Sequence, residues 1–383
     1  MHVTSAPLPL RVLHVTQPVD GGVARVVADL VRMQRAAGMS VRVACPPSGS
    51  LPGHLTDLGC EVLAWEASRS PGRSVLGEAR RLAEVVDRVR PDVIHAHSAK
   101  AGLVTRLVVR GRIPTVFQPH AWSFEAVEGL GARMALTWER RGARWASRLI
   151  CVSRAERDTG TAHGIAAEWR LVPNGVDLER FSPAGPSAAG RFGLPATGPL
   201  VVCVGRLCRQ KGQDVLVEAW RGVLRERPGA HLVLVGDGPD LAELRAAAPP
   251  SVTFAGSVDD PAPWYRAADL VVLPSRWEGM ALAPLEAMAC GSPVLVTDVN
   301  GARESLPPPL APKCLAPPED PAALTRALVG LLSDAEDLRT LGRDAHRHVH
   351  AHHDVRRTAA AVADVYGELL GLETIKCREP VTT

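Results

Sequence analysis

Short apolar runs recur along the whole sequence, and each is followed by a longer stretch with helical spacing. In the first half they are "RVLHVT" (11–16), "VRVAC" (41–45), "EVLAW" (61–65), "DVIHAH" (92–97), "PTVFQPH" (114–120) and "RLICVS" (148–153). In the second half they are "LVVCVGR" (200–206), "HLVLVG" (231–236), "SVTFAG" (251–256), "LVVLPS" (270–275) and "PVLVTD" (293–298). Because the runs are nearly continuously apolar, they are typical of strands that helices cover on both faces. The alternation predicts an α/β protein with parallel, doubly wound sheets.

The domain division follows from length and from one irregular segment. A chain of 383 residues is longer than one core usually supports, so we expect two Rossmann-like domains facing a cleft. Residues 177–199 are rich in Pro, Gly, Ser and Ala without periodicity, which predicts a linker. The expected domains are then 1–176 and 200–372, followed by a tail at 373–383. The last helices are expected to complete the second domain, with packing back onto the first domain left open.

Composition excludes several classes of protein. A net charge of +3 is too small to predict a nucleic-acid partner. The eight cysteines form no C-x-x-C pair, a pattern typical of reduced thiols in a cytoplasmic protein. The sequence begins without the charged and apolar regions of a signal peptide, and no run is long enough to span a bilayer. We therefore expect a soluble, cytoplasmic protein.

The loop after the run at 200–206 carries two cations. Arg206 and Lys211 lie in "GRLCRQKG", which leads into a helix, and two cations beside a helix N-terminus suit a diphosphate. Only four of the 44 basic residues of Lys and Arg are lysines, so a lysine at position 211 is unusual for this sequence. The alternative is a solvated turn, since the loop lacks the Walker pattern.

The turn after the first run supplies Gly21 and Gly22 immediately before a helix. Paired glycines let a ligand approach the backbone, although a purely structural tight turn is the alternative. Neither this turn nor "VGDGPDL" is G-x-G-x-x-G, so a dinucleotide-dependent dehydrogenase is poorly supported.

Histidines follow two first-half runs. His120 comes at the end of one, where catalytic residues of such folds lie, and a structural histidine is the alternative. His95 and His97 alternate along another run and could suggest a metal, but no third ligand is evident nearby, so a role in loop structure or acceptor contact is favoured. The sequence also contains no D-x-D pair, which leaves a divalent ion without an obvious holder. The histidine-rich segment 346–354 is interpreted as a solvated helix.

The stretch "WEGMALAPLEAMACG" keeps Glu278 and Glu286 among small and apolar residues. The spacing predicts Glu278 on a loop and Glu286 in a helix that has Pro284 in its first turn and Gly291 just past its end. The backbone amides between the glutamates can hold an anion while the carboxylates accept hydroxyl hydrogen bonds. The alternative is a capping carboxylate plus a buried ion pair. The predicted ligand-binding residues of this stretch are Gly279, Met280, Ala281, Leu282 and Glu286.

These motifs resemble a known family. The E-x7-E of "EGMALAPLE" with "AMACGSPVLVTDVNGARE", together with "VGRLCRQKG", "GGVAR", "VPNGVD" and "CVSRAERD", is similar to the signature of retaining family-four glycosyltransferases of GT-B fold. Among them it looks most like enzymes of exopolysaccharide or cell-envelope assembly. The likeness covers nearly the whole chain. It departs at "DVNGARE", where many relatives have paired glycines.

The resemblance implies transfer of a sugar from a nucleotide-diphosphate donor to an acceptor hydroxyl, with retained anomeric configuration. Glu278 would contact the donor sugar as a catalytic residue, and Glu286 would contact the ribose. Arg206 and Lys211 would bind the diphosphate and stabilise it as it leaves, which favours a front-face displacement. No cofactor and no tightly bound metal are expected.

By the same resemblance Gly22 would lie near the phosphates, and His120 would contact the transferred sugar as a catalytic residue. The first domain would bind the acceptor, which is a saccharide, a lipid-linked sugar or a small specialised metabolite. The helix "ARMALTWERRGARWASR" carries Trp138 and Trp145, and it is expected either to rest peripherally on an anionic membrane or to pack in its domain. A nucleotide-sugar 2-epimerase and a non-catalytic nucleotide-sugar sensor are the alternative functions.

Overall fold

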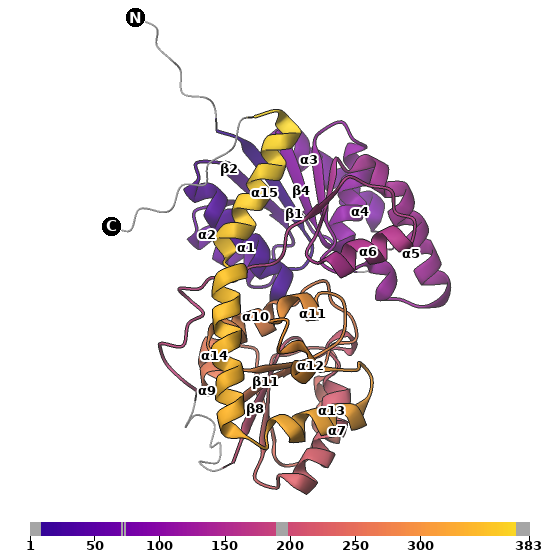
Figure 1. Ribbon diagram of the computed structural model, residues 1–383. Helices are drawn as coiled ribbons and strands as arrows, with labels where there is room; N and C mark the ends of the chain where they lie inside the picture. Colours follow the sequence, from indigo (N-terminus) through magenta and orange to yellow (C-terminus); the bar gives the residue numbers. More distant parts are fainter. Residues whose placement is uncertain (1–8, 70–71, 73, 189–197, 373–383) are drawn as a thin grey trace, which may run out of the picture. The chain divides into compact units, whose positions relative to one another are not determined.

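The computed structural model describes residues 9–69, 72, 74–188 and 198–372, and it divides into two compact units (Figure 1). The first unit comprises Met1–Val152, Glu156–Val172 and Arg356–Thr383, and the second comprises Ser153–Ala155 and Pro173–Val355. Part of the predicted linker, 189–197, and the predicted tail, 373–383, lie outside the described residues.

The first unit contains a parallel sheet of seven strands in the order β3-β2-β1-β4-β5-β6-β7. Its strands are β1 (Arg11–Thr16), β2 (Ser40–Cys45), β3 (Glu61–Ala64), β4 (Val93–His97), β5 (Thr115–Gln118), β6 (Arg148–Cys151) and β7 (Trp169–Leu171). Its helices are α1 (Gly21–Ala36), α2 (Leu51–Asp57), α3 (Val75–Val89), α4 (Ser98–Val109), η1 (Ser123–Glu125), α5 (Gly129–Gly142), η2 (Ala143–Trp145), α6 (Arg154–Ala162) and α15 (Val355–Leu370), two of which extend slightly beyond the unit.

The second unit contains a parallel sheet of six strands in the order β10-β9-β8-β11-β12-β13. Its strands are β8 (Leu200–Val204), β9 (His231–Val235), β10 (Val252–Gly256), β11 (Leu270–Leu273), β12 (Val294–Thr297) and β13 (Leu315–Ala316). Its helices are η3 (Arg209–Lys211), α7 (Gln213–Glu226), α8 (Leu241–Ala247), α9 (Ala262–Ala267), α10 (Leu282–Ala289), α11 (Ala302–Ser305), α12 (Ala311–Cys314), α13 (Pro321–Leu331) and α14 (Ala335–His352).

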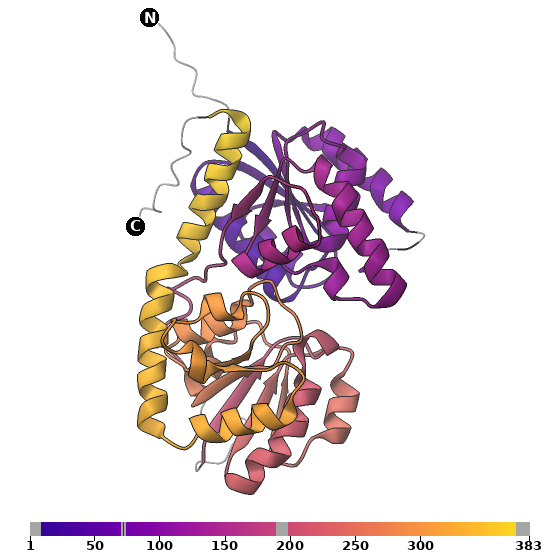
Figure 2. The same cartoon turned by 45° about the vertical axis from the view of Figure 1, so that its right-hand side comes forward.

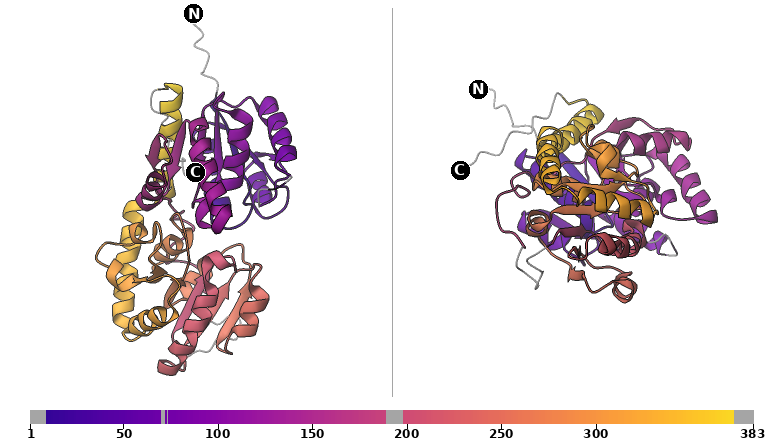
Figure 3. Two further views of the ribbon diagram at one scale, coloured as in Figure 1. Left: turned by 90° about the vertical axis from the view of Figure 1, so that its right-hand side faces the viewer. Right: turned by 60° about the horizontal axis from the view of Figure 1, so that its bottom comes forward.

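Both sheets confirm the predicted architecture. Every predicted run forms a strand, all strand pairs are parallel, and helices lie on both faces of each sheet (Figures 2 and 3). The buried strand residues join the inner faces of the helices in the cores, as continuously apolar strands require. The strands that the sequence did not predict, β7 and β13, are short edge strands of three and two residues.

The strand order places the loops that matter for function. In the first sheet the order reverses between β1 and β4, and in the second between β8 and β11. Ligands of open α/β sheets bind beyond the carboxyl ends of strands at this reversal. The predicted site residues follow β1, β5, β8 and β11, so they lie on such loops or next to them.

The segment expected to form one membrane-contacting or packed helix forms α5, which carries Trp138, and the short η2, which carries Trp145. The Trp138 and Trp145 rings lie 6.0 Å apart, and Arg106 lies over Trp138 while Arg144 lies over Trp145. The packing alternative therefore accounts for both tryptophans. No described helix combines the length and the apolar character needed to cross a membrane.

Candidate active site

The loop between β11 and α10 carries Glu278 and is held by close backbone approaches. A Cβ at Gly301 would lie 1.9 Å from the Gly279 carbonyl oxygen, and a Cβ at Gly212 would lie 2.1 Å from the Pro274 carbonyl oxygen. Both glycines also have positive φ angles, 74° and 65°. Only glycine fits at these contacts, so two neighbouring loops fix the backbone on which Glu278 stands.

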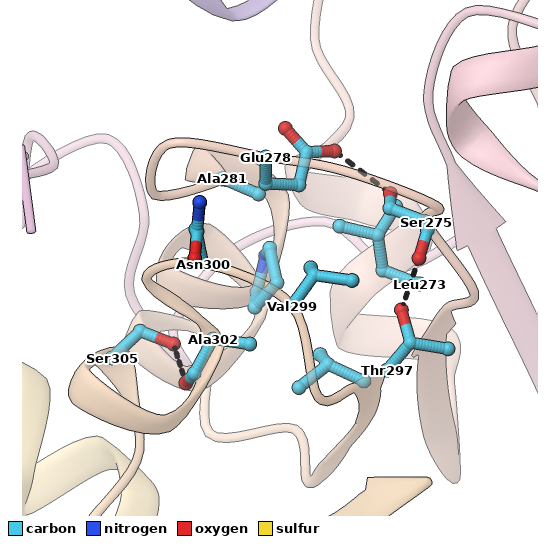
Figure 4. A pocket seen from close by; sticks show the side chains of 11 residues that line it. Leu273, Ser275, Glu278, Ala281, Thr297, Val299, Asn300, Ala302 and Ser305 are labelled. Atoms are coloured by element: carbon cyan, nitrogen blue, oxygen red, sulfur yellow. Dashed lines mark hydrogen bonds between the residues drawn. The ribbon is translucent and has the colours of Figure 1, made fainter. Parts of the chain in front are cut away.

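The Glu278 carboxylate is buried and accepts two strong hydrogen bonds. Its Oε1 accepts from the Ser275 hydroxyl at 2.7 Å and from the Lys211 ammonium at 2.5 Å. Figure 4 shows one carboxylate oxygen directed at Ser275 and the other directed away from it. No described residue hydrogen-bonds to Oε2, so this oxygen is available to a hydroxyl donor.

Two residues to which the sequence analysis gave different roles therefore form one ion pair. Lys211, assigned to the diphosphate, and Glu278, assigned to the sugar, are the partners of each other. Lys211 belongs to η3, and its aliphatic stem packs 3.8 Å from where a Cβ of Gly205 would be, so it lies beside the start of the Arg206 loop. Within the described ranges the half-buried Arg206 guanidinium has no hydrogen-bond partner. The Lys211–Glu278 pair thus lies next to the loop that carries a second cation, Arg206.

The start of α10 offers backbone amides. Its N-cap residue, Ala281, makes no side-chain cap, and Leu282 is the first helical residue. The Met280 carbonyl, just before the helix, accepts from the buried Asn174 amide at 2.8 Å. Gly279 precedes Met280 on the same buried loop. Of the alternative interpretation, the capping carboxylate is absent from this described helix, whereas the ion pair is present, because Glu278 binds Lys211 and Ser275.

Glu286 lies deeper, on α10. It is 1% exposed, and its Oε2 accepts from the Tyr265 hydroxyl at 2.8 Å. Tyr265 comes from α9 and is itself fully buried. A buried carboxylate with a hydroxyl partner is positioned firmly. Glu286 and Glu278 therefore stand at different depths, with separate partners.

The histidine-rich segment is not simply a solvated helix. His350 and His352 are exposed as expected, but His346 Nδ1 contacts the Ala289 carbonyl at 2.9 Å, at the end of α10. His353 is buried and its Nδ1 contacts the Asn174 carbonyl at 2.9 Å. The interpretation was wrong for these two histidines because they bind backbone groups that support the site.

In the first unit, Gly21 and Gly22 begin α1. Gly21 has a φ of 78°, which favours glycine, and a Cβ there would meet nothing within 4 Å. Both glycines are exposed, and the N-cap residue Asp20 makes no side-chain cap to the helix. The first turn of α1 therefore presents uncapped amides beside open space, as an anion site requires.

His120 follows β5 in a strained backbone conformation. Its φ is 61°, in the left-handed region that costs a non-glycine residue energy. Its Nε2 lies 3.1 Å from His97 Nδ1, and burial lowers the pKa of His120 to about 3. A neutral imidazole is therefore fixed at the carboxyl edge of the sheet.

A third histidine does accompany His95 and His97. His14 on β1 is in register with His95 on β4, and the nitrogens of the three buried rings lie within 4.8 Å of one another. The expectation that no third ligand is near was wrong, because this ligand comes from another strand. The His95 and His97 ring centroids lie 4.0 Å apart with 30° between the ring planes.

Sequence reasoning missed the residues that hold the site: Ser275, Tyr265, Asn174 and His14. Ser275 lies three residues before Glu278, so the local pattern already contained it. Asn174 stands in the motif "VPNGVD", but nothing in the motif names Met280 as its partner. Tyr265 and His14 have no sequence signal, because their contacts depend on how separate elements pack.

Comparisons with known proteins identify the family and the fold. The profile of Glycosyltransferase Family 4 matches residues 20–180, and that of Glycosyl transferases group 1 matches residues 198–334. D-inositol 3-phosphate glycosyltransferase of Thermobispora bispora is 32% identical over 346 residues, covering 84% of this chain and 76% of the relative. Lipopolysaccharide core biosynthesis mannosyltransferase LpsB of Rhizobium meliloti is 28% identical and covers 91% of this chain and 94% of its own.

A third relative is UDP-Gal:alpha-D-GlcNAc-diphosphoundecaprenol alpha-1,3-galactosyltransferase of Escherichia coli, 28% identical over 76% of this chain and 80% of its own. Among solved structures, Anabaena HepE in complex with UDP and glucose superposes with a TM-score of 0.79 at 22% identity, covering 93% of this chain and 99% of that one. Sucrose-phosphate synthase from Thermosynechococcus elongatus gives 0.79 at 24% identity, covering 94% and 99%. The chain belongs to the family-four, group 1 glycosyltransferases and has their GT-B fold.

Proposed function

We propose that the protein transfers a sugar from a nucleotide-diphosphate donor to an acceptor hydroxyl with retention of anomeric configuration. The observation that carries the proposal is the Lys211–Glu278 pair beside the uncapped start of α10, with Arg206 on the loop that leads to Lys211. Cations and helix amides suit a diphosphate, and the open Oε2 of Glu278 suits a sugar hydroxyl.

In this mechanism the cations act on the leaving group. Arg206 and Lys211 bind the diphosphate and stabilise its growing charge as the bond to the sugar breaks. The amides at the start of α10 share that charge, and Glu286 holds the ribose from within the helix. Binding needs no tightly held metal ion, because fixed cations already face the diphosphate.

The reacting sugar is held by two side chains in the proposal. Glu278 accepts from its hydroxyls through Oε2, and His120 contacts it as the catalytic residue of the first unit. The incoming acceptor hydroxyl attacks from the face that the diphosphate leaves, so the leaving phosphate takes the acceptor proton. The product then keeps the donor's anomeric configuration.

We further propose that the acceptor is a lipid-linked or polymeric saccharide of exopolysaccharide, glycolipid or cell-envelope synthesis. The support is the set of relatives, whose names include a lipopolysaccharide core mannosyltransferase and a galactosyltransferase acting on a diphosphoundecaprenol-linked sugar. Peripheral contact with the inner face of the plasma membrane is part of this proposal. It is supported by the exposed Leu130 and Met134 on α5, which is also rich in arginine.

The test begins with a thermal-shift screen of nucleotide sugars, followed by incubation of the stabilising donor with lipid-linked and small acceptors. We expect a new glycosidic linkage whose configuration, measured by NMR, matches that of the donor. His120→Ala should leave nucleoside diphosphate affinity nearly intact and lower transfer by about 10²-fold, the scale of a lost transition-state contact. An inverted product, or a His120→Ala enzyme as active as the parent, would refute the mechanism.

A further inference from the structure

A chain of hydrogen bonds runs through the first unit and ends at His120. Gln34 Oε1 lies 2.8 Å from His14 Nε2, and His14 Nδ1 lies 2.9 Å from His97 Nε2. His97 Nδ1 then lies 3.1 Å from His120 Nε2. Gln34, His14 and His97 are all fully buried, so water does not compete for these contacts.

The amide of Gln34 sets the donor-to-acceptor direction of this chain of hydrogen bonds. Gln34 Nε2 donates to the Tyr366 hydroxyl at 3.4 Å, which turns the amide oxygen toward His14. His14 must therefore donate from Nε2 and accept at Nδ1, because a neutral imidazole has one donor and one acceptor. By the same rule His97 donates to His14 and accepts at Nδ1, so His120 donates to His97 from Nε2.

The rings are neutral, as this argument requires. Burial lowers the pKa of His14 to about 4 and that of His120 to about 3, and it lowers the pKa of His97 well below its usual value. Strand geometry supplies the spacing: β1 and β4 are neighbours in the sheet, and Thr16 is in register with His97. Gln34 comes from α1 and Tyr366 from α15, so two helices supply the end of the chain of hydrogen bonds opposite His120.

We propose that Gln34, His14 and His97 are positioning residues that hold His120 in the Nε2–H tautomer, so that its Nδ1 accepts a hydrogen bond. No described residue donates to His120 Nδ1. The group that His120 recognises must then be a hydroxyl or amine donor and not a carbonyl or phosphate oxygen. That this group is a sugar hydroxyl rests on the proposed function; the tautomer itself does not.

The tautomer is measured directly in the full chain labelled with ¹⁵N-histidine, with the His120 signals assigned by their loss in His120→Ala. We expect a protonated Nε2 and an unprotonated Nδ1. His97→Phe keeps an aromatic ring but removes both nitrogens, so the His120 signals should shift toward a mixture of tautomers. His97→Asn places an oxygen where Nδ1 stood and should keep the parent spectrum.

Activity gives a second measurement. His97→Phe should lower kcat about tenfold with unchanged nucleoside diphosphate affinity, the scale of one lost hydrogen bond. His97→Asn should recover most of that loss. Gln34→Leu, which removes the anchor without touching β4, should act like His97→Phe, whereas Gln34→Glu keeps the acceptor toward His14. His54→Phe on the exposed surface of α2 is the matched control and should change nothing.

The outcomes separate the two proposals. A protein that shows the expected tautomer, loses it in His97→Phe and transfers no sugar would keep the positioning role and refute the proposed function. A protonated Nδ1 in the parent, or an unchanged His120 spectrum in His97→Phe, would overturn the positioning role whatever the activity. One equivalent of a transition metal in the purified protein, lost in His97→Phe, would also overturn it, because those nitrogens would then be ligands.

Discussion

Lys211→Met tests the diphosphate site and the ion pair together. The substitution removes the ammonium that lies 2.5 Å from Glu278 Oε1 and keeps most of the aliphatic stem. Among the described residues, Glu278 then keeps Ser275 as its remaining hydrogen-bond partner, and 9% of the Glu278 side chain is exposed. Two losses are expected, one in stability and one in ligand affinity.

The magnitudes follow from this burial. Leaving an unpaired carboxylate in a mostly dry position costs about 1–3 kcal/mol, below the full penalty of a buried pair because 20% of the Lys211 side chain is exposed. A charge-assisted contact to the diphosphate contributes about 1.5–3 kcal/mol, which weakens nucleoside diphosphate binding about 10- to 150-fold. The remaining Glu278 charge also repels the diphosphate and adds to the loss.

The double variant Lys211→Met/Glu278→Gln isolates the pair. Because the neutral amide needs no counter-charge, urea unfolding should show the double variant at least about 1 kcal/mol more stable than the two single losses added together. Calorimetry with free nucleoside diphosphate should show that the double variant binds more tightly than Lys211→Met, because the repelling carboxylate is gone. It should still bind more weakly than the parent, because the cation is missing. Arg209→Met is the matched control, since it removes one positive charge from the exposed side of the same turn.

Three results would each contradict a part of this reasoning. Unchanged nucleoside diphosphate affinity in Lys211→Met would exclude Lys211 from the diphosphate site. Stability losses that add without coupling would show that the Lys211–Glu278 contact contributes nothing in solution. An affinity loss as large in Arg209→Met would mean that overall charge, and not this contact, determines binding.

Three further predictions concern the remaining groups. Glu286→Gln should mainly raise the KM for the donor, as a loss of uniform binding does, whereas Glu278→Gln should lower kcat with less effect on nucleoside diphosphate affinity; steady-state kinetics that reverse this split would contradict the assignment. A chelator should leave initial rates unchanged, and a complete loss restored by manganese or magnesium would show that the site needs an ion. Stability should fall in acid: burial lowers the folded pKa of His14 to about 4 and that of His120 to about 3, below the unfolded value near 6.5, so the unfolded chain binds more protons. The contribution is complete above about pH 6.5 and is lost as pH falls toward 4, by up to about 1.4 kcal/mol per pH unit for each histidine; urea unfolding with no such slope would contradict it.

The fold was predictable because the local sequence of nearly every strand is typical of a strand. The run at 200–204 is apolar at every position, which is typical of a strand covered on both faces. The exceptions were β7 and β13. Both are edge strands of a few residues, paired on one side only, so their sequences carry neither the length nor the continuous apolar character of an inner strand.

The sequence predicted the elements that carry Glu278 and Glu286, but not the residues that contact the site. Spacing alone placed Glu278 on a loop and Glu286 inside α10, as the structure has them. It could not supply Tyr265 for Glu286, or Asn174 for the Met280 carbonyl, which is 106 positions away along the chain. Such pairs arise where separate elements pack, and no periodicity encodes which residue of one element faces which residue of another.

The hydrogen-bonded histidines of the first unit show this limit most clearly. The alternation of a strand puts His95 and His97 on one face, which the sequence does specify. Adding His14 requires knowing that β1 is the neighbour of β4 and that its register pairs His14 with His95. A shift of one residue would turn His14 to the opposite face and leave His97 Nε2 without its acceptor. The chemical state of His120 therefore depends on a register that both buried faces of the sheet enforce, so the core that stabilises the first unit also determines which atom His120 presents.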